Sequence, residues 1–335
     1  LEKENMHNYL FFKNFFFIIF SILILSNCDS SSKSYELKDF SIKDTASIVK
    51  FKISDTENNS IVISRVNESK IWMIEGSNYN ATKPSVDLLM ETFYRIRVKQ
   101  DVPNSSLKTI FNRLSVKHKK VEIFTNENEN PIKTWYIGSP TQDHMGTYML
   151  LQNDKIKSSI PYITYKPGMY GSLDVRFFTD FESWRSSKVF HYQNSNHIKN
   201  IRVNFHTNKI ESYHIERKDN SVLIYDTYGK LISNYDTIQV RHYLTHFNNI
   251  NYNKVMNFKQ DIIDSIFLLS PHCSFVLNDI YGLNKVVDFW KIRDKNSETG
   301  WDKEYGFIRI DKNNELLRAQ YFNWEILFKP LSYFK

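Results

Sequence analysis

Cysteine is nearly absent from this chain of 335 residues, in which only Cys28 and Cys273 occur. This scarcity excludes disulfide-rich scaffolds, which small exported domains use for stability, and it also excludes paired CxxC metal sites. If Cys28 is modified, as argued below, no structural disulfide remains. The folded part must then be stabilised by packing alone.

Glycine and proline are also scarce, at 9 and 8 residues, whereas aromatic residues make up 15% of the chain. Disordered and low-complexity chains have the opposite composition, so we expect a packed globular body. The chain contains no Walker-type phosphate loop, no dinucleotide glycine pattern, no G-x-S-x-G and no HExxH. We therefore expect no enzymatic activity, no catalytic residues, no cofactor and no resident metal.

The charge is nearly balanced, with 44 basic and 37 acidic residues dispersed along the chain and a net charge of +7. We expect most of these residues to form an ordinary solvated surface and no nucleic acid to be bound. The small basic excess would favour an anionic lipid, an acidic glycan or an acidic protein as partner.

The N-terminal apolar run is too short to cross a membrane. Phe15 to Leu25 supply eleven residues, and a spanning helix needs about 20. Lys13 precedes the run and Leu-Ser-Asn-Cys28 closes it, which is the layout of a secretory signal peptide ending in a lipobox. We expect residues 1–27 to be removed and Cys28 to be lipidated; an uncleaved signal anchor is the alternative. Because the chain opens with Leu1, Met6 is a candidate start.

The lipidated Cys28 and a serine-rich tether (28–43) would anchor the body to the inner or outer membrane of the cell envelope, facing the periplasm. A first α+β module is predicted over 44–165. It contains alternating strands at 48–53, 61–65 and 71–74, a helix opened by Pro84, a second helix near 107–114, and strands at 121–124, 134–137, 147–151 and 156–165.

A second α+β module, over 197–335, repeats the order of the first. An offset of 152 places Val49, Phe51 and Ile53 on Ile201, Val203 and Phe205. An offset of 154 places Met90, Phe93 and Ile96 on Leu244, Phe247 and Ile250, and Trp135-Tyr136 on Phe289-Trp290. An offset of 160 places Gly146, Tyr148 and Leu150 on Gly306, Ile308 and Ile310. We therefore predict two duplicated modules, each an antiparallel meander sheet with one or two helices.

Residues 166–196 are predicted to connect the modules. Leu173 to Phe190 has the pattern of a helix, with Phe177, Phe181 and Trp184 on one face. We expect that face to be buried, and an aromatic row for ligand binding is the alternative.

Several motifs give the first half a family resemblance. They are the Arg65 to Trp72 spacing, NRLSV, WYIGSPTQDHMGTYML, SIPYI and FESWRSSKVF, in that order. Over roughly Asp44 to Phe190 the chain resembles the bacterial envelope family catalogued as domain of unknown function four-three-four-zero. It departs from that pattern at Asn112 to Ser115, where members more often carry Tyr-Gly-Leu. The resemblance implies a membrane-anchored accessory protein without enzymatic activity, associated with ABC-type export or gliding-motility components.

Few residues suggest chemistry of their own. Asp143-His144 is an acid–base or half-metal candidate, but a hairpin turn is the simpler interpretation because adjacent strand residues point to opposite faces. His242 and His246 have the i, i+4 spacing of a helical metal pair, and we interpret them as surface residues. His272-Cys273 is interpreted as buried structure.

Trp301 is the best candidate for a ligand contact, because it lies in a predicted loop that is longer than its counterpart in the first module. Trp72, Trp135, Trp290 and Trp324 lie in predicted strands and are expected in the cores. The sequence thus predicts a lipid-anchored, non-enzymatic interaction subunit with envelope partners. The alternative is a glycan- or lipid-binding lipoprotein that uses exposed aromatic residues.

Overall fold

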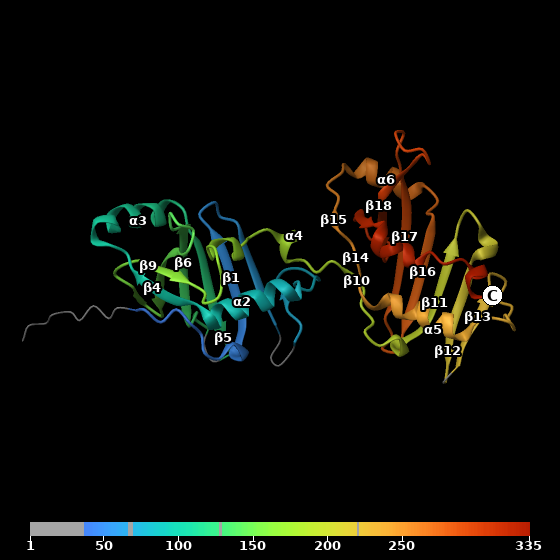
Figure 1. The fold of residues 1–335 in the computed structure, drawn as a ribbon, viewed down its shortest axis with the longest axis horizontal. Coiled ribbons are helices and arrows are strands. Elements are labelled where there is room, and N and C mark those ends of the chain that lie inside the picture. The colour runs from blue at the N-terminus through green and yellow to red at the C-terminus, as the bar shows by residue number, and fades with distance from the viewer. Residues whose placement is uncertain (1–36, 66–69, 127–128, 220) are drawn as a thin grey trace, which may run out of the picture. The chain divides into compact units, whose positions relative to one another are not determined.

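The computed structural model describes residues 37–65, 70–126, 129–219 and 221–335 (Figure 1). The predicted signal peptide, Cys28 and most of the tether lie outside these residues. Within the described part of the chain, no helix has the length and apolar character needed to cross a membrane.

The chain forms two compact units. The first comprises the described residues up to Ser60 together with Met90–Phe177, and the second comprises Ile61–Leu89 and Phe178–Lys335. Residues 61–89, predicted within the first module, therefore group with the second unit, although they also supply two strands to the first sheet.

The first sheet is antiparallel, with the strand order β3-β2-β1-β5-β6-β7-β9-β4 and β8 paired to β7. Its strands are β1 (Ile48–Asp55), β2 (Ser60–Ser64), β3 (Met73–Ile74), β4 (Arg97–Asp101), β5 (Lys119–Thr125), β6 (Lys133–Pro140), β7 (Thr147–Asn153), β8 (Ile156–Lys157) and β9 (Tyr162–Tyr165).

The second sheet is also antiparallel and has the order β13-β12-β11-β16-β17-β18-β19-β15. Its strands are β11 (Ile198–Phe205), β12 (Tyr213–Lys218), β13 (Ser221–Asp226), β15 (Lys254–Val255), β16 (Cys273–Asp279), β17 (Asn284–Arg293), β18 (Trp301–Ile310) and β19 (Leu317–Gln320). A separate pair joins β10 (Lys188–Phe190) to β14 (Ile250–Asn251).

The two sheets have one topology. Matching the strands in chain order, with β4 matched to β15, turns the first strand order into the second; only β8, which pairs with β7 beside this path, has no counterpart among the described strands. Even a register irregularity recurs, after Ile48 in β1 and after Ile198 in β11. The predicted α+β class is confirmed, and the sheet layout is consistent with the predicted duplication.

The strand registers correct three of the predicted offsets. The predicted offset of 154 places Ile123 of β5 on Leu277 of β16. Phe51 pairs with Ile123 and Ile201 pairs with Leu277, so β1 and β11 correspond at 201 − 51 = 150 rather than 152. Lys119 pairs with Ile137 and Cys273 with Phe289, so β6 and β17 correspond at 289 − 137 = 152 rather than 154. A two-residue slip keeps every side chain on its face, so alternation alone cannot detect it.

The third correction is a slip of one residue. Ile137 pairs with Met149 and Phe289 with Ile308, which gives 308 − 149 = 159 rather than 160. A one-residue slip exchanges the two faces of a strand. The hydrophobic pattern does not distinguish the two registers, because Met149, Leu150 and Leu151 are all buried and β7 is apolar on both faces.

One face of each sheet is covered by the first helix of the module. In the first sheet this is α2 (Lys83–Arg95), where Val86, Leu89 and Phe93 are buried as predicted and the Phe93 ring meets Trp135 edge-on at 5.2 Å. In the second it is α5 (Thr237–Thr245), whose Tyr243 and Leu244 belong to a core that includes the C-terminal segment. This segment holds α7 (Tyr321–Trp324).

The opposite face of each sheet carries the second helix. Ile110 and Leu114 of α3 (Asn104–Val116) pack with Leu150 and Ile163 of the first sheet. In the second unit, Phe267 of α6 (Gln260–Leu268) lies 5.6 Å from the ring of Trp290.

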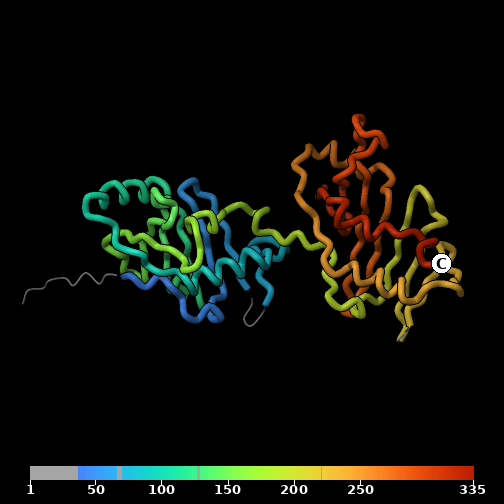
Figure 2. Tube along the Cα trace, in the orientation of Figure 1, coloured from blue at the N-terminus to red at the C-terminus, as the bar shows by residue number. Residues whose placement is uncertain are grey.

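The long connector helix predicted over 173–190 is wrong. The segment forms a single 3-10 turn, η2 (Asp174–Arg176), then the one-turn helix α4 (Phe181–Trp184), and then strand β10 (Figure 2). Asp180 caps α4, but the chain turns extended directly after Trp184, and β10 takes its hydrogen bonds from β14. Phe177 and Trp184 are buried as expected, whereas Phe181 is 36% exposed.

Further short 3-10 turns link the elements: η1 (Thr45–Ser47), η3 (Ser195–His197), η4 (Lys209–Glu211), η5 (His246–Asn248), η6 (Glu325–Leu327) and η7 (Leu331–Phe334).

Candidate functional site

The second unit contains a groove of about 720 Å³ beside strand β10. Its walls come from residues 71–80, from β10 and the residues around it, and from the turns at 279–283 and 310–313. The lining includes four tyrosines and three cationic side chains: Tyr79, Tyr192, Tyr252, Tyr281, Arg185, Lys188 and Lys285.

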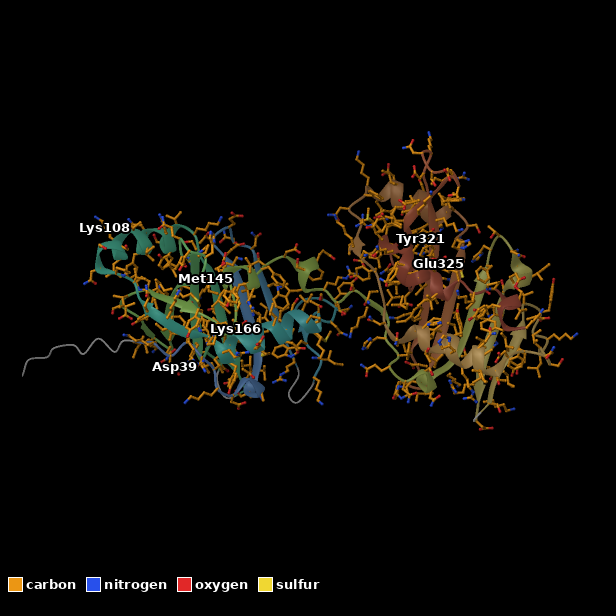
Figure 3. All side chains as sticks on the ribbon, in the orientation of Figure 1. Asp39, Lys108, Met145, Lys166, Tyr321 and Glu325 are labelled. Atoms are coloured by element: carbon orange, nitrogen blue, oxygen red, sulfur yellow. The ribbon has the colours of Figure 1, made fainter. Side chains whose placement is uncertain are left out.

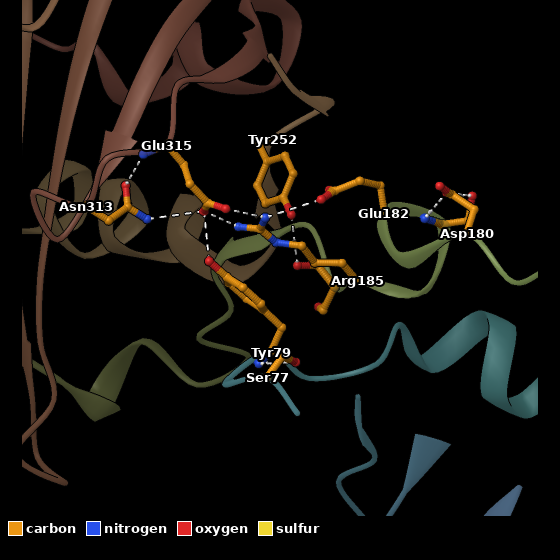
Figure 4. A network of polar contacts seen from close by, with 10 residues as sticks. Ser77, Tyr79, Asp180, Glu182, Arg185, Tyr252, Asn313 and Glu315 are labelled. Carbon is orange, nitrogen blue, oxygen red and sulfur yellow. Dashed lines mark hydrogen bonds and ion pairs between the residues drawn. The ribbon is translucent and has the colours of Figure 1, made fainter. Parts of the chain in front are cut away.

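Arg185 is one of the residues that line the groove, and Glu315 holds it in a network of polar contacts (Figure 4). The guanidinium donates two hydrogen bonds to this carboxylate, Nη1 to Oε1 at 2.9 Å and Nη2 to Oε2 at 2.6 Å. The hydroxyl of Tyr79 donates to the same Oε2 at 2.8 Å. Only 3% of the Arg185 side chain is exposed, whereas 32% of the Glu315 side chain is, so the arginine is the buried partner of the ion pair.

Two aromatic rings hold the guanidinium from its sides. Its central carbon lies 3.7 Å from the ring centre of Tyr79 and 5.5 Å from that of Tyr252, within the range of cation–π attraction. Burial raises the pKa of Tyr252 to about 12. Burial alone would raise the pKa of Glu315, but the hydrogen bonds from Arg185 and Tyr79 hold it below its usual value. These groups keep fixed charge states at neutral pH, which suits binding better than proton transfer.

Another part of the lining is the turn that begins at Asp279. The hydroxyl of Tyr192 donates to Oδ2 of Asp279 at 3.2 Å, while Oδ1 accepts the backbone N–H groups of Tyr281 and Leu283, each at 2.9 Å. The Tyr281 ring meets His197 edge-on at 5.3 Å, and 73% of Tyr281 remains exposed. The turn thus presents one exposed aromatic ring on a fixed backbone.

Two lysines, Lys188 and Lys285, also line the groove. Nζ of Lys285 donates to the backbone carbonyl of Val189 at 3.0 Å, and Nζ of Lys188 lies 3.3 Å from Nε2 of His191. Burial lowers the pKa of Lys285, and the nearby charge of Asp311 offsets this only in part. Burial and the charge of Lys188 lower the pKa of His191.

A second pocket, of about 810 Å³, lies in the first unit beside the C-terminal half of α3. Val116, Ile137 and Pro140 give it apolar walls. At its edge, Nζ of Lys119 donates to the backbone carbonyl of Asp174 at 3.0 Å, and burial lowers the pKa of Lys119. Oδ1 of Asp174 is buried without a hydrogen-bond partner among the described residues.

Trp301, the predicted ligand contact, is the first residue of β18 rather than part of a loop. It pairs with Arg293 of β17, whose guanidinium lies 4.7 Å from the indole ring centre, and the residue is half-buried. Trp301 does not line either of the two pockets described above. Cys28, the predicted lipidation site, lies outside the described residues.

The Asp143-His144 pair forms a turn. Asp143 accepts hydrogen bonds from the hydroxyl of Thr141 and from the backbone of Met145, which Figure 3 labels. His144 has a φ of +57°. Both side chains are exposed, and Asp143 serves to close the turn between β6 and β7, as the simpler interpretation predicted.

The predicted histidine pair is close in space, with the rings of His242 and His246 4.8 Å apart. Burial and the charges of His242 and Lys329 lower the pKa of His246. Within the described ranges, no three His, Cys, Asp or Glu side chains are grouped to hold a metal ion. Cys273 is fully buried, and burial raises the pKa of its thiol.

Comparison with known proteins adds no relative, since no family model, curated protein or solved structure matches the chain. The groove of the second unit is therefore assessed on its geometry alone. Sequence reasoning missed it because its tyrosines and lysines come from separate turns and strands, and no local spacing brings them together.

Proposed function

We propose that this chain is a lipoprotein of the cell envelope that works by binding rather than by catalysis, as an accessory subunit anchored through Cys28. The signal-like run Phe15 to Leu25 and the Leu-Ser-Asn-Cys sequence support the anchor. The resemblance to the envelope family supports the accessory role and suggests an ABC-type export or gliding-motility component as partner.

The observation that carries the binding role is the construction of the groove in the second unit. Ligand sites typically occupy roughly 300–1,000 Å³ and use a few well-placed polar groups among apolar and aromatic walls. At about 720 Å³, with Arg185 locked by Glu315 and Tyr281 held on a fixed turn, the groove fits this description. Its Arg185–Glu315 pair and its Asp279 turn are held by internal hydrogen bonds, an arrangement that favours a preformed site.

The groove specifically favours the second candidate function, a glycan- or lipid-binding lipoprotein. The aromatic residues that line the groove are tyrosines, however, and Trp301 is not among them. The two roles are compatible, because an accessory subunit can present a ligand to its membrane partner.

The test is affinity purification of the tagged full chain from gently solubilised envelopes, followed by mass spectrometry of the proteins recovered. We expect stoichiometric recovery of a membrane transport or motility component. The matched sample is the Cys28→Ala chain, which should not recover it after fractionation because it lacks the anchor. Recovery of the wild-type chain with no partner would contradict the accessory role and leave the ligand-binding role to be judged by the next experiment.

A further inference from the structure

We propose that the groove of the second unit binds an acidic saccharide, with its carboxylate between Lys188 and Lys285 and a sugar face against Tyr281. This inference rests on the proposed binding function and names the ligand class of the same site. Three features of the groove support it: the charges of its lining residues, its exposed aromatic ring and its volume.

The groove contains two ammonium groups that form no direct ion pair, although the charge of Asp311 acts on Lys285 from further away. Among the described residues, neither Lys188 nor Lys285 has a carboxylate within ion-pair distance; their contacts are the imidazole of His191 and the carbonyl of Val189. Both lysines line the groove. Lys285 is partly buried and Lys188 is exposed. A partly buried cation that lacks a direct ion pair is costly, so an arriving carboxylate would gain charge-assisted hydrogen bonds.

The acidic residues of the groove are already engaged. Asp279 accepts the Tyr192 hydroxyl and two backbone amides, as described above. Oδ1 of Asp311 accepts the backbone N–H of Val286 at 2.8 Å. Glu315, which is bonded to Arg185 but does not itself line the groove, is occupied by Arg185 and Tyr79. The remaining titratable group that faces the lysines is His191, with His197 at the turn, and neither opposes an anion.

The aromatic surface favours a sugar over a simple anion. A pyranose has C–H faces that pack on an aromatic ring and a rim of hydroxyls that needs hydrogen-bond partners. Tyr281 offers a ring that is 73% exposed, and the amide side chains of Asn78, Asn80 and Asn313 line the same groove. Amides both donate and accept, which matches hydroxyl groups. The groove volume of about 720 Å³ leaves room for an oligosaccharide.

The test uses two probes with one carbon skeleton, α-1,4-linked tetragalacturonate and its neutral methyl ester. Isothermal titration calorimetry is run with the full chain in detergent micelles. We expect the acid to bind and the ester to bind at least tenfold more weakly, and we expect the affinity for the acid to fall as salt rises. Equal affinity for both probes, or no binding of the acid, would overturn the inference.

Variants locate the site. Lys188→Gln should weaken acid binding about three- to tenfold, because it removes one charge-assisted contact from an exposed position. Lys230→Gln, an exposed lysine on the β13 side of the same unit, should leave binding unchanged. Tyr281→Ala should abolish binding, and Tyr281→Phe should retain it because the ring persists. Equal loss in Lys188→Gln and Lys230→Gln would mean non-specific attraction and would contradict the proposal.

A lipid headgroup is the competing source of an anion. Phosphatidylglycerol vesicles serve as the third probe, and we expect no more binding to them than to neutral phosphatidylcholine vesicles. Binding to the anionic vesicles that Tyr281→Ala leaves intact and tetragalacturonate fails to displace would exclude the saccharide. The anchor and partner claims are tested separately by purification of the Cys28→Ala chain, so failure of either result can be told from failure of the other.

Discussion

At the scale of single residues, Arg185 is the most constrained charge in the groove. Its side chain is almost fully buried, and Glu315 supplies both acceptors that balance it. Removing one partner of such a pair costs more than the pair contributes, because the remaining charge stays buried. The pair is therefore a sensitive point for the second unit.

We expect Glu315→Ala to lower the free energy of unfolding by about 2–3 kcal/mol, slightly below the usual range for buried pairs because the Glu315 side chain is 32% exposed. Urea unfolding followed by tryptophan fluorescence would measure it. Glu182→Ala is the control, since Glu182 lies 3.7 Å from Arg185 and is 48% exposed, and should cost little. Equal effects of both variants would contradict this account.

The same pair makes a prediction for pH. The pKa of Glu315 is lower in the folded chain than its usual value, so the unfolded chain binds the proton more readily. The stability from this group is complete above the unfolded pKa of about 4.3 and is lost as the pH falls through the folded value. Below about pH 4, the difference in stability between wild type and Glu315→Ala should therefore shrink. A difference that does not change as the solution is acidified through this range would contradict the assignment.

At the scale of elements, sequence patterns predicted kinds and order better than register or length. Alternation located most strands of the first sheet and the helical face of α2, because burial follows the period of each element. It missed β4 and merged β8 and β9 into one strand over 156–165. It placed β1 two residues out and β7 one residue out, since a strand that is buried on both faces, as β7 is, has no alternation to read. Register comes from long-range hydrogen bonds, which a local pattern does not contain.

The prediction of a connector helix over 173–190 is wrong for a related reason. Its residues Phe177, Phe181 and Trp184 have helical spacing, but Val189 and Phe190 belong to the core of the second sheet. Tertiary burial of these two residues favours an extended strand over a longer helix. The groove could not be predicted from local sequence patterns either, because Lys188 belongs to β10 and Lys285 to β17, almost a hundred residues further on.

Gly306 tests the packing of β18 against β17. A Cβ at this position would lie 2.2 Å from Cζ of Phe289 and 2.8 Å from the carbonyl oxygen of Trp290. One neighbour is a buried ring and the other is backbone, so neither can move away easily. We expect Gly306→Ala to destabilise the chain by about 1–3 kcal/mol in thermal unfolding. Ser221→Ala, at an exposed position on β13, is the control, and a neutral Gly306→Ala would contradict the close approach of these two strands.

At the scale of the whole molecule, the two units repeat one topology but differ in their outer faces. Leu150 of the first sheet packs with α3, whereas its register equivalent at 150 + 159 = 309 is Arg309. Arg309 forms an ion pair with Asp288 at 3.0 Å and lies 4.4 Å from the ring centre of Phe267. The first sheet thus has an apolar outer contact at this position and the second a charged one, although the two sheets share one strand order.

At the same scale, the proposed lipid anchor at Cys28 rests on the sequence alone. Of the two cysteines, Cys28 directly follows the signal-like run. Cys273 is fully buried in the second core, so its thiol is not accessible for lipidation. Cys28→Ala should therefore move the protein from the membrane pellet to the supernatant after a carbonate wash. Cys273→Ala, a matched loss of one thiol, should leave it in the pellet even if the core is weakened. A single acyl chain gives only marginal membrane binding, so stable pelleting of the wild type indicates more than one chain at Cys28. Cys28→Ala protein that still pellets would show that the apolar run remains as an uncleaved anchor, and the lipoprotein proposal would fall.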